Sequence, residues 1–156
     1  MSLRERIKEA TLLALVLGLL LGLPLGIYAY DQVYWSQRIP PGAKVFTFTG
    51  NTDLGWVPGR IHGYQVVELG APGNGYSRPV VRVRRGDLVV FRLTSSDVIH
   101  GFSLKAFGIF IPDGIRPGKV TLVSFRADKV GTFTFSCSII CGPRHKNMQG
   151  TLVVGA

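Results

Sequence analysis

The sequence predicts a mainly β domain, folded as a Greek-key β-sandwich, behind one N-terminal transmembrane α-helix. Short segments rich in Val, Phe and Thr, separated by Gly and Pro, cover residues 44–49, 64–69, 79–84, 87–94, 119–125, 131–137 and 150–155. Short strands at this spacing are typical of a sandwich. Ahead of them, residues 10–30 carry no charge. About 21 helical residues at ~1.5 Å each match the ~30 Å hydrocarbon core of a bilayer.

The apolar run is expected to be a retained anchor. The alternative is a cleaved signal peptide, whose apolar core is about 7–15 residues long and ends at a small-x-small site. This run ends instead in Tyr28-Ala29-Tyr30. Aromatic side chains in this position are typical of a membrane interface.

Basic residues before the span predict its orientation. Arg4, Arg6 and Lys8 precede it, and basic residues favour the cytoplasmic side. The sequence therefore predicts a single-pass protein of the cell membrane. Its segments are a cytoplasmic tail (1–9), the transmembrane anchor (10–30), a connector (31–43) and a β domain (44–156) on the periplasmic or extracellular side.

The chain is strongly basic, with a net charge of +9 from 18 basic and 9 acidic residues. Nucleic acid is a common partner of basic proteins. Export argues against it, and the basic residues alternate with Val and Gly rather than with stacking aromatic residues. Anionic lipid headgroups or an acidic protein fit better. On one strand, Arg82 and Arg84 are expected on the solvent face, opposite Val81 and Val83.

Soft metal ligands are concentrated near the C-terminus. The stretch CSIICGPRHKNMQG holds both cysteines of the chain, Cys137 and Cys141, together with His145 and Met148. Thiolate, imidazole and thioether groups are ligands that copper prefers. A single-copper blue site needs only one cysteine. The second thiolate, in a Cys-x-x-x-Cys spacing, therefore indicates a binuclear centre.

Zinc and a disulfide are the alternatives for this loop. Structural zinc usually takes four tetrahedral ligands at knuckle spacings, and Met is not among them. A disulfide is allowed outside the cytoplasm, but a bridge between Cys137 and Cys141 closes a small loop and stabilises little. It would also leave His145 and Met148 unexplained.

A second imidazole is expected from His100. This residue follows the predicted strand 87–94 in SSDVIHGFSL, and a Greek-key sandwich can bring that strand end beside the C-terminal loop. His62 lies much earlier, between two glycines. We expect His62 to be exposed and to take no part in the site.

These segments resemble the CuA domain of cytochrome c oxidase subunit II, which has a cupredoxin-like fold. The pattern H…C-x-x-x-C-x-x-x-H-x-x-M is matched at every side-chain ligand, and the resemblance covers roughly residues 75–156. It implies two copper ions, held by His100, Cys137, the backbone carbonyl of Ile139, Cys141, His145 and Met148.

In that family the two thiolates bridge the copper ions and each histidine holds one of them. The thioether and the carbonyl are weak axial ligands. Phe102, Phe133 and Phe135 would shield the centre from water, although ordinary core packing explains these residues equally well.

The resemblance also implies a function. The chain would be the subunit through which electrons enter a respiratory haem–copper terminal oxidase, an oxidoreductase. It would take electrons one at a time from an external cytochrome c or small copper protein and pass them to haem in a catalytic membrane subunit. No catalytic residue is expected here, because oxygen reduction would occur in that other subunit. The alternatives are the CuA subunit of a nitric oxide reductase and a membrane-anchored copper carrier.

Several departures from the family pattern narrow this interpretation. Many relatives carry a glutamate between the cysteines that serves a magnesium site. Ile139 stands there instead, and its side chain cannot bind a hard cation, so no magnesium site is expected. This feature and the single membrane helix resemble the B-type branch of haem–copper oxidases. The aromatic-rich tryptophan segment that many relatives use for electron entry is not found, and GNTDLGWVPG, which contains Trp56, gives no clear alignment with it. Arg144 and Lys146 predict an acidic or hydrophobically docking donor.

Overall fold

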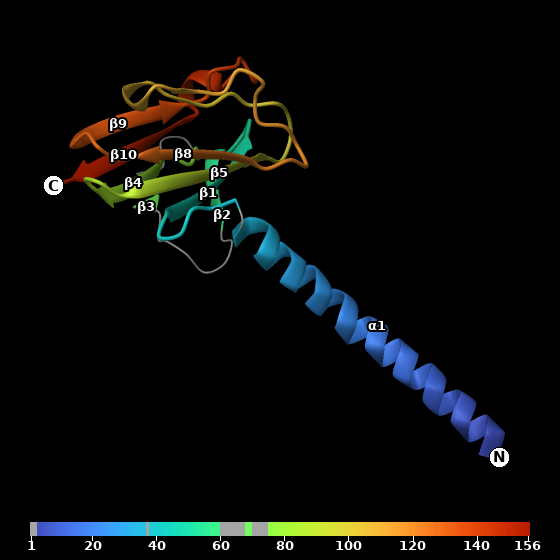
Figure 1. Cartoon of the computed structure of the whole chain (residues 1–156). Helices are drawn as coiled ribbons and strands as arrows, with labels where there is room; N and C mark the ends of the chain where they lie inside the picture. The colour runs from blue at the N-terminus through green and yellow to red at the C-terminus, as the bar shows by residue number, and fades with distance from the viewer. Residues whose placement is uncertain (1–2, 37, 60–67, 70–74) are drawn as a thin grey trace. The chain divides into compact units, whose positions relative to one another are not determined.

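The structure, a computed structural model, describes residues 3–36, 38–59, 68–69 and 75–156, which belong to two compact units. The first unit contains one helix, α1 (Leu3–Ser36) (Figure 1). Its segment Arg4–Tyr30 is long and apolar enough to cross a membrane. Every leucine from Leu12 to Leu25 is exposed. Because exposed apolar side chains in such number are costly in water, this surface fits a lipid environment.

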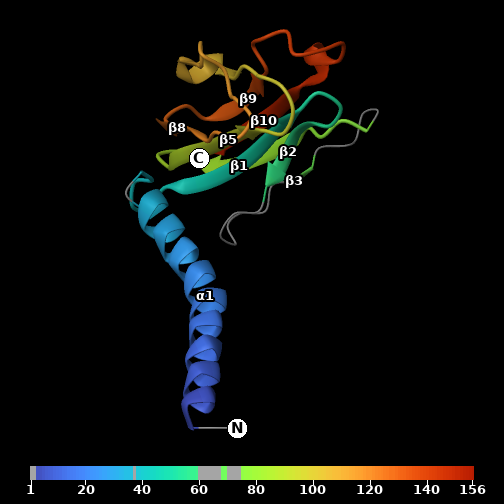
Figure 2. The ribbon, with the colours of Figure 1, turned by 90° about the vertical axis from the view of Figure 1, so that its right-hand side faces the viewer.

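The second unit is a sandwich of two β-sheets, as Figures 1 and 2 show. The smaller sheet has the order β2-β1-β5-β8, from Gly55–Gly59, Lys44–Asn51, Leu88–Ser95 and Thr121–Arg126. The larger sheet has the order β3-β4-β10-β9-β6-β7, from Glu68–Leu69, Pro79–Arg84, Gln149–Gly155, Gly131–Ser136, Ser103–Leu104 and Ile109–Phe110. Strand β1 runs parallel to β5 and β4 parallel to β10, whereas the other neighbours are antiparallel. The predicted β-sandwich is confirmed.

Each predicted strand has a counterpart in the sandwich. For the segment 64–69 only residues 68–69 are described; residues 64–67, like His62, lie outside the described part of the chain. Strand β8 begins at Thr121 rather than at Lys119, because Lys119 is still in a turn closed by its N–H···O bond of 3.2 Å to Arg116. Strands β2, β6 and β7 were not predicted.

The tight connection between β4 and β5 carries the chain from one sheet to the other. Asp87 holds it, accepting hydrogen bonds from the backbone N–H of Arg84 at 2.7 Å and from Nζ of Lys44 at 2.6 Å. Burial raises the pKa of this carboxyl, but its bonds to Lys44 and Arg84 outweigh burial and lower the pKa below its ordinary value. The alternation along β4 is as predicted, with Val81 and Val83 buried and the intervening arginines exposed.

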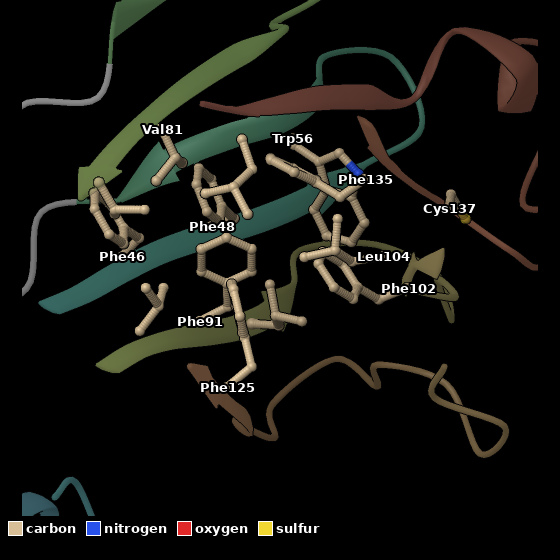
Figure 3. Close-up of a cluster of buried hydrophobic side chains, with 14 of the residues drawn as sticks. Phe46, Phe48, Trp56, Val81, Phe91, Phe102, Leu104, Phe125, Phe135 and Cys137 are labelled. Atoms are coloured by element: carbon tan, nitrogen blue, oxygen red, sulfur yellow. The ribbon is translucent and has the colours of Figure 1, made fainter. Parts of the chain in front are cut away.

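An aromatic core joins the two sheets. Phe91 of β5 lies at its centre, fully buried, with ring centroids 5.4–6.0 Å from those of Phe46, Phe48, Phe102, Phe125 and Phe135. Most of these pairs are edge-to-face, the arrangement that aromatic quadrupoles favour. Figure 3 shows the cluster extending through Phe102, Leu104 and Phe135 towards Cys137. The core therefore supports the loop that bears the cysteines.

Candidate metal centre

Two adjacent strands hold the ends of the cysteine loop. Cys137 directly follows β9 and Met148 directly precedes β10. The two strands pair antiparallel through Ser136 and Gln149. A further hydrogen bond of 3.0 Å joins the Cys137 N–H to the Met148 carbonyl. The loop ends are thus fixed by the sheet, while residues between them are free of strand geometry and can converge.

A second loop brings His100 to the same place. His100 is fully buried and pairs with Ile115 through two backbone hydrogen bonds of 3.1 and 2.6 Å. The next residue, Gly101, lies against the cysteine loop: a Cβ on it would come within 2.6 Å of the Ile139 nitrogen. Its N–H instead donates to the Cys137 sulfur at 3.3 Å. Glycine is therefore needed at 101 for the two loops to meet.

The soft side chains converge on one small volume. The Cys137 and Cys141 sulfurs are 3.6 Å apart, and Cys141 Sγ lies 3.8 Å from His145 Nδ1 and 3.9 Å from Met148 Sδ. The ligand atoms offered by His100, Cys137 and Cys141 all lie within 4.8 Å of one another. Both cysteines are free thiols, whereas a disulfide would need sulfurs at about 2.05 Å.

The position of Ile139 also agrees with the predicted set. Its carbonyl oxygen lies 3.1 Å from the Cys137 sulfur, so the backbone oxygen faces the cluster. The end of the Ile139 side chain lies near Gly114, since a Cβ on Gly114 would be 3.1 Å from Ile139 Cδ1. The structure therefore brings together all six of the groups that the sequence predicted as ligands.

His100 is oriented by a carboxylate. Its Nε2 lies 2.8 Å from Asp97 Oδ1, while its Nδ1 is buried without a hydrogen-bond partner among the described residues. A buried polar atom without a partner is costly, and a metal ion would satisfy it. A ligating histidine usually donates its other N–H to a carboxylate or carbonyl, which is the role that Asp97 fits here.

The pKa values of the two thiols are shifted in opposite directions. Burial opposes ionisation of Cys137, but the neighbouring imidazole of His100 and the backbone N–H groups of Ile139 and Gly101 stabilise the thiolate and lower its pKa to about 6. Burial, followed by the negative charge of Cys137, raises the pKa of Cys141 to about 12. Although burial opposes it, hydrogen bonds from Thr52 and His100 hold the pKa of Asp97 far below its ordinary value. The same contacts with Cys137 and Asp97 raise the pKa of His100 against the effect of burial.

The inner side of the site is lined by buried apolar side chains. Phe102, Phe135 and Met148 are almost completely buried, and Phe133 packs against the same core. The ring of the fully buried Trp56 lies 6.1 Å from the His100 ring, centroid to centroid. The outer side is open: Ile140 is 87% exposed. A site that is buried on its inner side and close to solvent on its outer side suits a centre that exchanges electrons with a partner while its ligands stay in place.

Sequence reasoning missed three supporting residues. Asp97 orients His100, Gly101 permits the close approach of the loops, and Trp56 lines the site. The first two lie within three residues of His100 in SSDVIHGF, a spacing that could have singled them out. Nothing local to Trp56 indicates that it lies beside His100, because that contact is made across the fold.

Comparison with known proteins gives a consistent result. The family model described as the periplasmic domain of cytochrome c oxidase subunit II matches residues 76–155. A cytochrome c oxidase subunit 2 from Thermus thermophilus is 38% identical over 80 residues, which are 51% of this chain and 58% of the relative. One from Cereibacter sphaeroides is 39% identical over 66 residues, 42% of this chain and 21% of the relative. The matched part of the chain thus spans 58% of the first relative and 21% of the second.

Solved structures show the same fold. The periplasmic domain of subunit II of a Bradyrhizobium japonicum cytochrome oxidase superposes with a TM-score of 0.59 at 25% identity, covering 74% of this chain and 86% of that one. A chain of a haem–copper terminal oxidase dimer covers 94% of this chain and 99% of its own length, with a TM-score of 0.52 at 21% identity. The second likeness is one of fold alone.

Proposed function

Since the chain belongs to the family of the cytochrome c oxidase subunit II periplasmic domain, we propose that it is the subunit through which electrons enter a respiratory haem–copper oxidase. The convergence of two thiols, two imidazoles and a thioether at the end of a rigid sandwich is the observation that carries this proposal. Thiolate, imidazole and thioether groups together suit copper, a redox metal. The chemistry that we propose for the site is therefore the transfer of electrons.

The proposed cofactor is a pair of copper ions. Cys137 and Cys141 would bridge both ions, because their sulfurs are close enough to face the same two metals. His100 and His145 would each hold one ion. Met148 and the Ile139 carbonyl would be weak axial ligands, and we expect no magnesium site at Ile139. When bound, such a pair takes up and releases one electron at a time.

The protein's own contribution is to keep the ligands in place. The β9 and β10 ends fix Cys137 and Met148, and Asp97 orients His100. Buried aromatic rings exclude water from the inner side. A cage that does not rearrange between the oxidised and reduced states lowers the reorganisation cost of each transfer. The burial of His100 and Cys137 also favours retained copper over the exchangeable metal of a carrier protein.

Two partners follow from this function. A haem-bearing membrane subunit would receive the electrons, and a soluble cytochrome c or small copper protein would donate them. The exposed side chain of Ile140 lies in the loop between the cysteines, and Arg144 and Lys146, which follow in the sequence, are also exposed. An apolar tip flanked by basic side chains fits a donor with an apolar or acidic docking surface. For the orientation in the membrane we propose what the sequence predicts: a cytoplasmic tail, one transmembrane span and an external copper domain.

The proposal is tested with the full chain loaded with copper in detergent. Cys137→Ser should abolish the copper pair, because one bridge cannot hold both ions. Met148→Leu should retain both ions and raise the reduction potential, because an axial thioether tunes the potential rather than anchoring the metal. Loss of copper from the Met148→Leu variant would contradict the axial role. The preferred oxidant of the purified complex would separate an oxygen reductase from a nitric oxide reductase.

A further inference from the structure

A wall of the candidate centre comes from the hairpin of β1 and β2. At its tip, Gly50 lies directly against two of the proposed ligands, which arrive from different loops. A Cβ on Gly50 would lie 2.7 Å from Cδ2 of His100 and 3.1 Å from the terminal methyl of Met148. No side chain fits in that space without displacing one of the two. Figure 2 shows the connection of β1 and β2 at the same end of the sandwich as the C-terminal loop.

The peptide groups of Thr52 join both histidine-bearing loops. The N–H of Thr52 donates to Asp97 Oδ2 at 2.7 Å, and the other oxygen of Asp97 holds His100 at 2.8 Å. The carbonyl of Thr52 accepts a hydrogen bond from the hydroxyl of Tyr76. The guanidinium of Arg144, the residue before the proposed ligand His145, lies 5.6 Å from the centre of the Tyr76 ring.

The hairpin tip is itself held firmly. The Asn51 side chain accepts hydrogen bonds from the N–H groups of Asp53 at 2.9 Å and Leu54 at 3.0 Å. The Ser96 N–H donates to the Gly50 carbonyl at 3.1 Å, and the Ser77 N–H donates to the Leu54 carbonyl at 2.8 Å. These hydrogen bonds hold the tip to Ser96 and Ser77 without the help of any proposed ligand, so it can act as a fixed reference for the ligand-bearing loops.

We propose that the tip of this hairpin, residues 50–54, is a positioning element that sets the spacing of the two histidine-bearing loops around the copper pair. Gly50 sets the gap between His100 and Met148, and Thr52 holds His100 through Asp97 and the His145 loop through Tyr76. This inference rests on the proposed function. None of these residues touches the metal as a ligand; they act through the ligands, as outer contacts do in other metal sites.

The first test is Gly50→Ala in the copper-loaded full chain. The control is Gly155→Ala, another strand glycine, whose added Cβ would have only one neighbour within 4 Å, the Val83 carbonyl at 3.9 Å. We expect Gly50→Ala to shift the reduction potential and to make the unpaired spin unequal on the two copper nuclei, or to lose one ion while the sandwich stays folded. Gly155→Ala should match the wild type. Identical spectra and potentials for the two variants would overturn the proposal.

The second test is Tyr76→Phe, which keeps the ring and removes only the hydroxyl. Loss of one hydrogen bond should speed copper transfer to a chelator by roughly two- to tenfold. In the copper-free protein, the amides of residues 97–100 and 142–148 should exchange with solvent faster than in the wild type. An unchanged exchange rate in both loops would overturn the proposal, even if Gly50→Ala fails to fold.

The two hypotheses fail in different ways. If the wild-type chain binds no copper pair, the proposed function is wrong, whereas faster exchange in copper-free Tyr76→Phe would still support the positioning element. If the wild type binds the pair and neither variant differs from its control, the proposed function stands and the positioning element is wrong.

Discussion

At the scale of single residues, Asp97 connects the metal site to the rest of the fold. It accepts hydrogen bonds from the Thr52 N–H at 2.7 Å and faces Nε2 of His100 at 2.8 Å. Asp97→Asn keeps the shape of the side chain but replaces one of its two acceptor oxygens with an NH2 group. It therefore loses the hydrogen bond either to Thr52 or to His100. Because such outer contacts are worth about 10–100-fold in metal affinity, we expect copper affinity to fall by about that factor. Competition with a chelator measures it. The exposed Asp128→Asn is the control, and equal affinities for both variants would contradict this role.

The two thiols should titrate far apart in the copper-free protein. Hydrogen bonds to the Cys137 thiolate outweigh burial and hold its pKa at about 6, while burial and the charge of Cys137 raise the pKa of Cys141 to about 12. Below about pH 6 both are protonated. Raising the pH through this value should therefore release one proton and form one thiolate per chain. Ultraviolet absorbance of the thiolate measures the step. Two equivalent ionisations near the ordinary value, about 8.5, would show that the sulfurs are not held as described.

At the scale of strands and loops, the aromatic core supports the site. Phe91 is fully buried between the sheets and contacts five other phenylalanine rings. Phe91→Ala should lower the free energy of unfolding by about 3–5 kcal/mol, the usual effect of a large cavity in a core. Phe110, which is 61% exposed, is the matched control, and Phe110→Ala should change it by less than about 0.5 kcal/mol. Urea unfolding measures both, and similar effects would contradict the described core.

The strands that the sequence predicts are those with a local signal. The segment at β4 alternates between arginine and valine, and the burial of its two faces follows that alternation. Strand β2 (GWVPG) contains two glycines and a proline, so it lacks the composition of a strand and forms through pairing with β1. Strands β6 and β7 are two residues each. Segments of that length carry no periodic pattern, and only the neighbouring chain defines them.

The proposed ligands of the C-terminal loop are predictable for a different reason. Cys137, Cys141, His145 and Met148 lie close together in the sequence, and such residues have few structural uses together, so their chemistry indicates a metal site without knowledge of the fold. The residues that place the ligands have no such signature. Gly50 and Trp56 reach His100 only after β1, β2 and β5 have assembled, and a contact across three strands leaves no mark in a local sequence.

At the scale of the whole molecule, the proposed function needs the copper domain outside the cytoplasm. The helix segment Arg4–Tyr30 is apolar enough to span a membrane, and its N-terminal basic residues favour a cytoplasmic tail. Alkaline phosphatase, which is active only after export, should therefore be active when fused after Ala156. Fusion before Leu3 should leave the enzyme inactive. The reverse pattern of activity would contradict the predicted orientation.

The charge of the external domain should affect the encounter with the donor. The tip of the cysteine loop combines the exposed Ile140 with the exposed Arg144 and Lys146. If the donor is acidic, its association rate falls as ionic strength rises, because steering by exposed charges is screened. If docking is apolar, the rate changes little with salt, and Ile140→Ser slows it. A rate that rises with salt would mean that the donor is basic and that its charge opposes docking.

The most direct measurement of the central claim is the copper content of the oxidised full chain, combined with the electron paramagnetic resonance spectrum of the same sample. We predict two copper ions per chain and one unpaired electron coupled equally to both copper nuclei. A single copper ion with an isolated spin, or a metal-free chain whose Cys137 and Cys141 have joined in a disulfide, would contradict it.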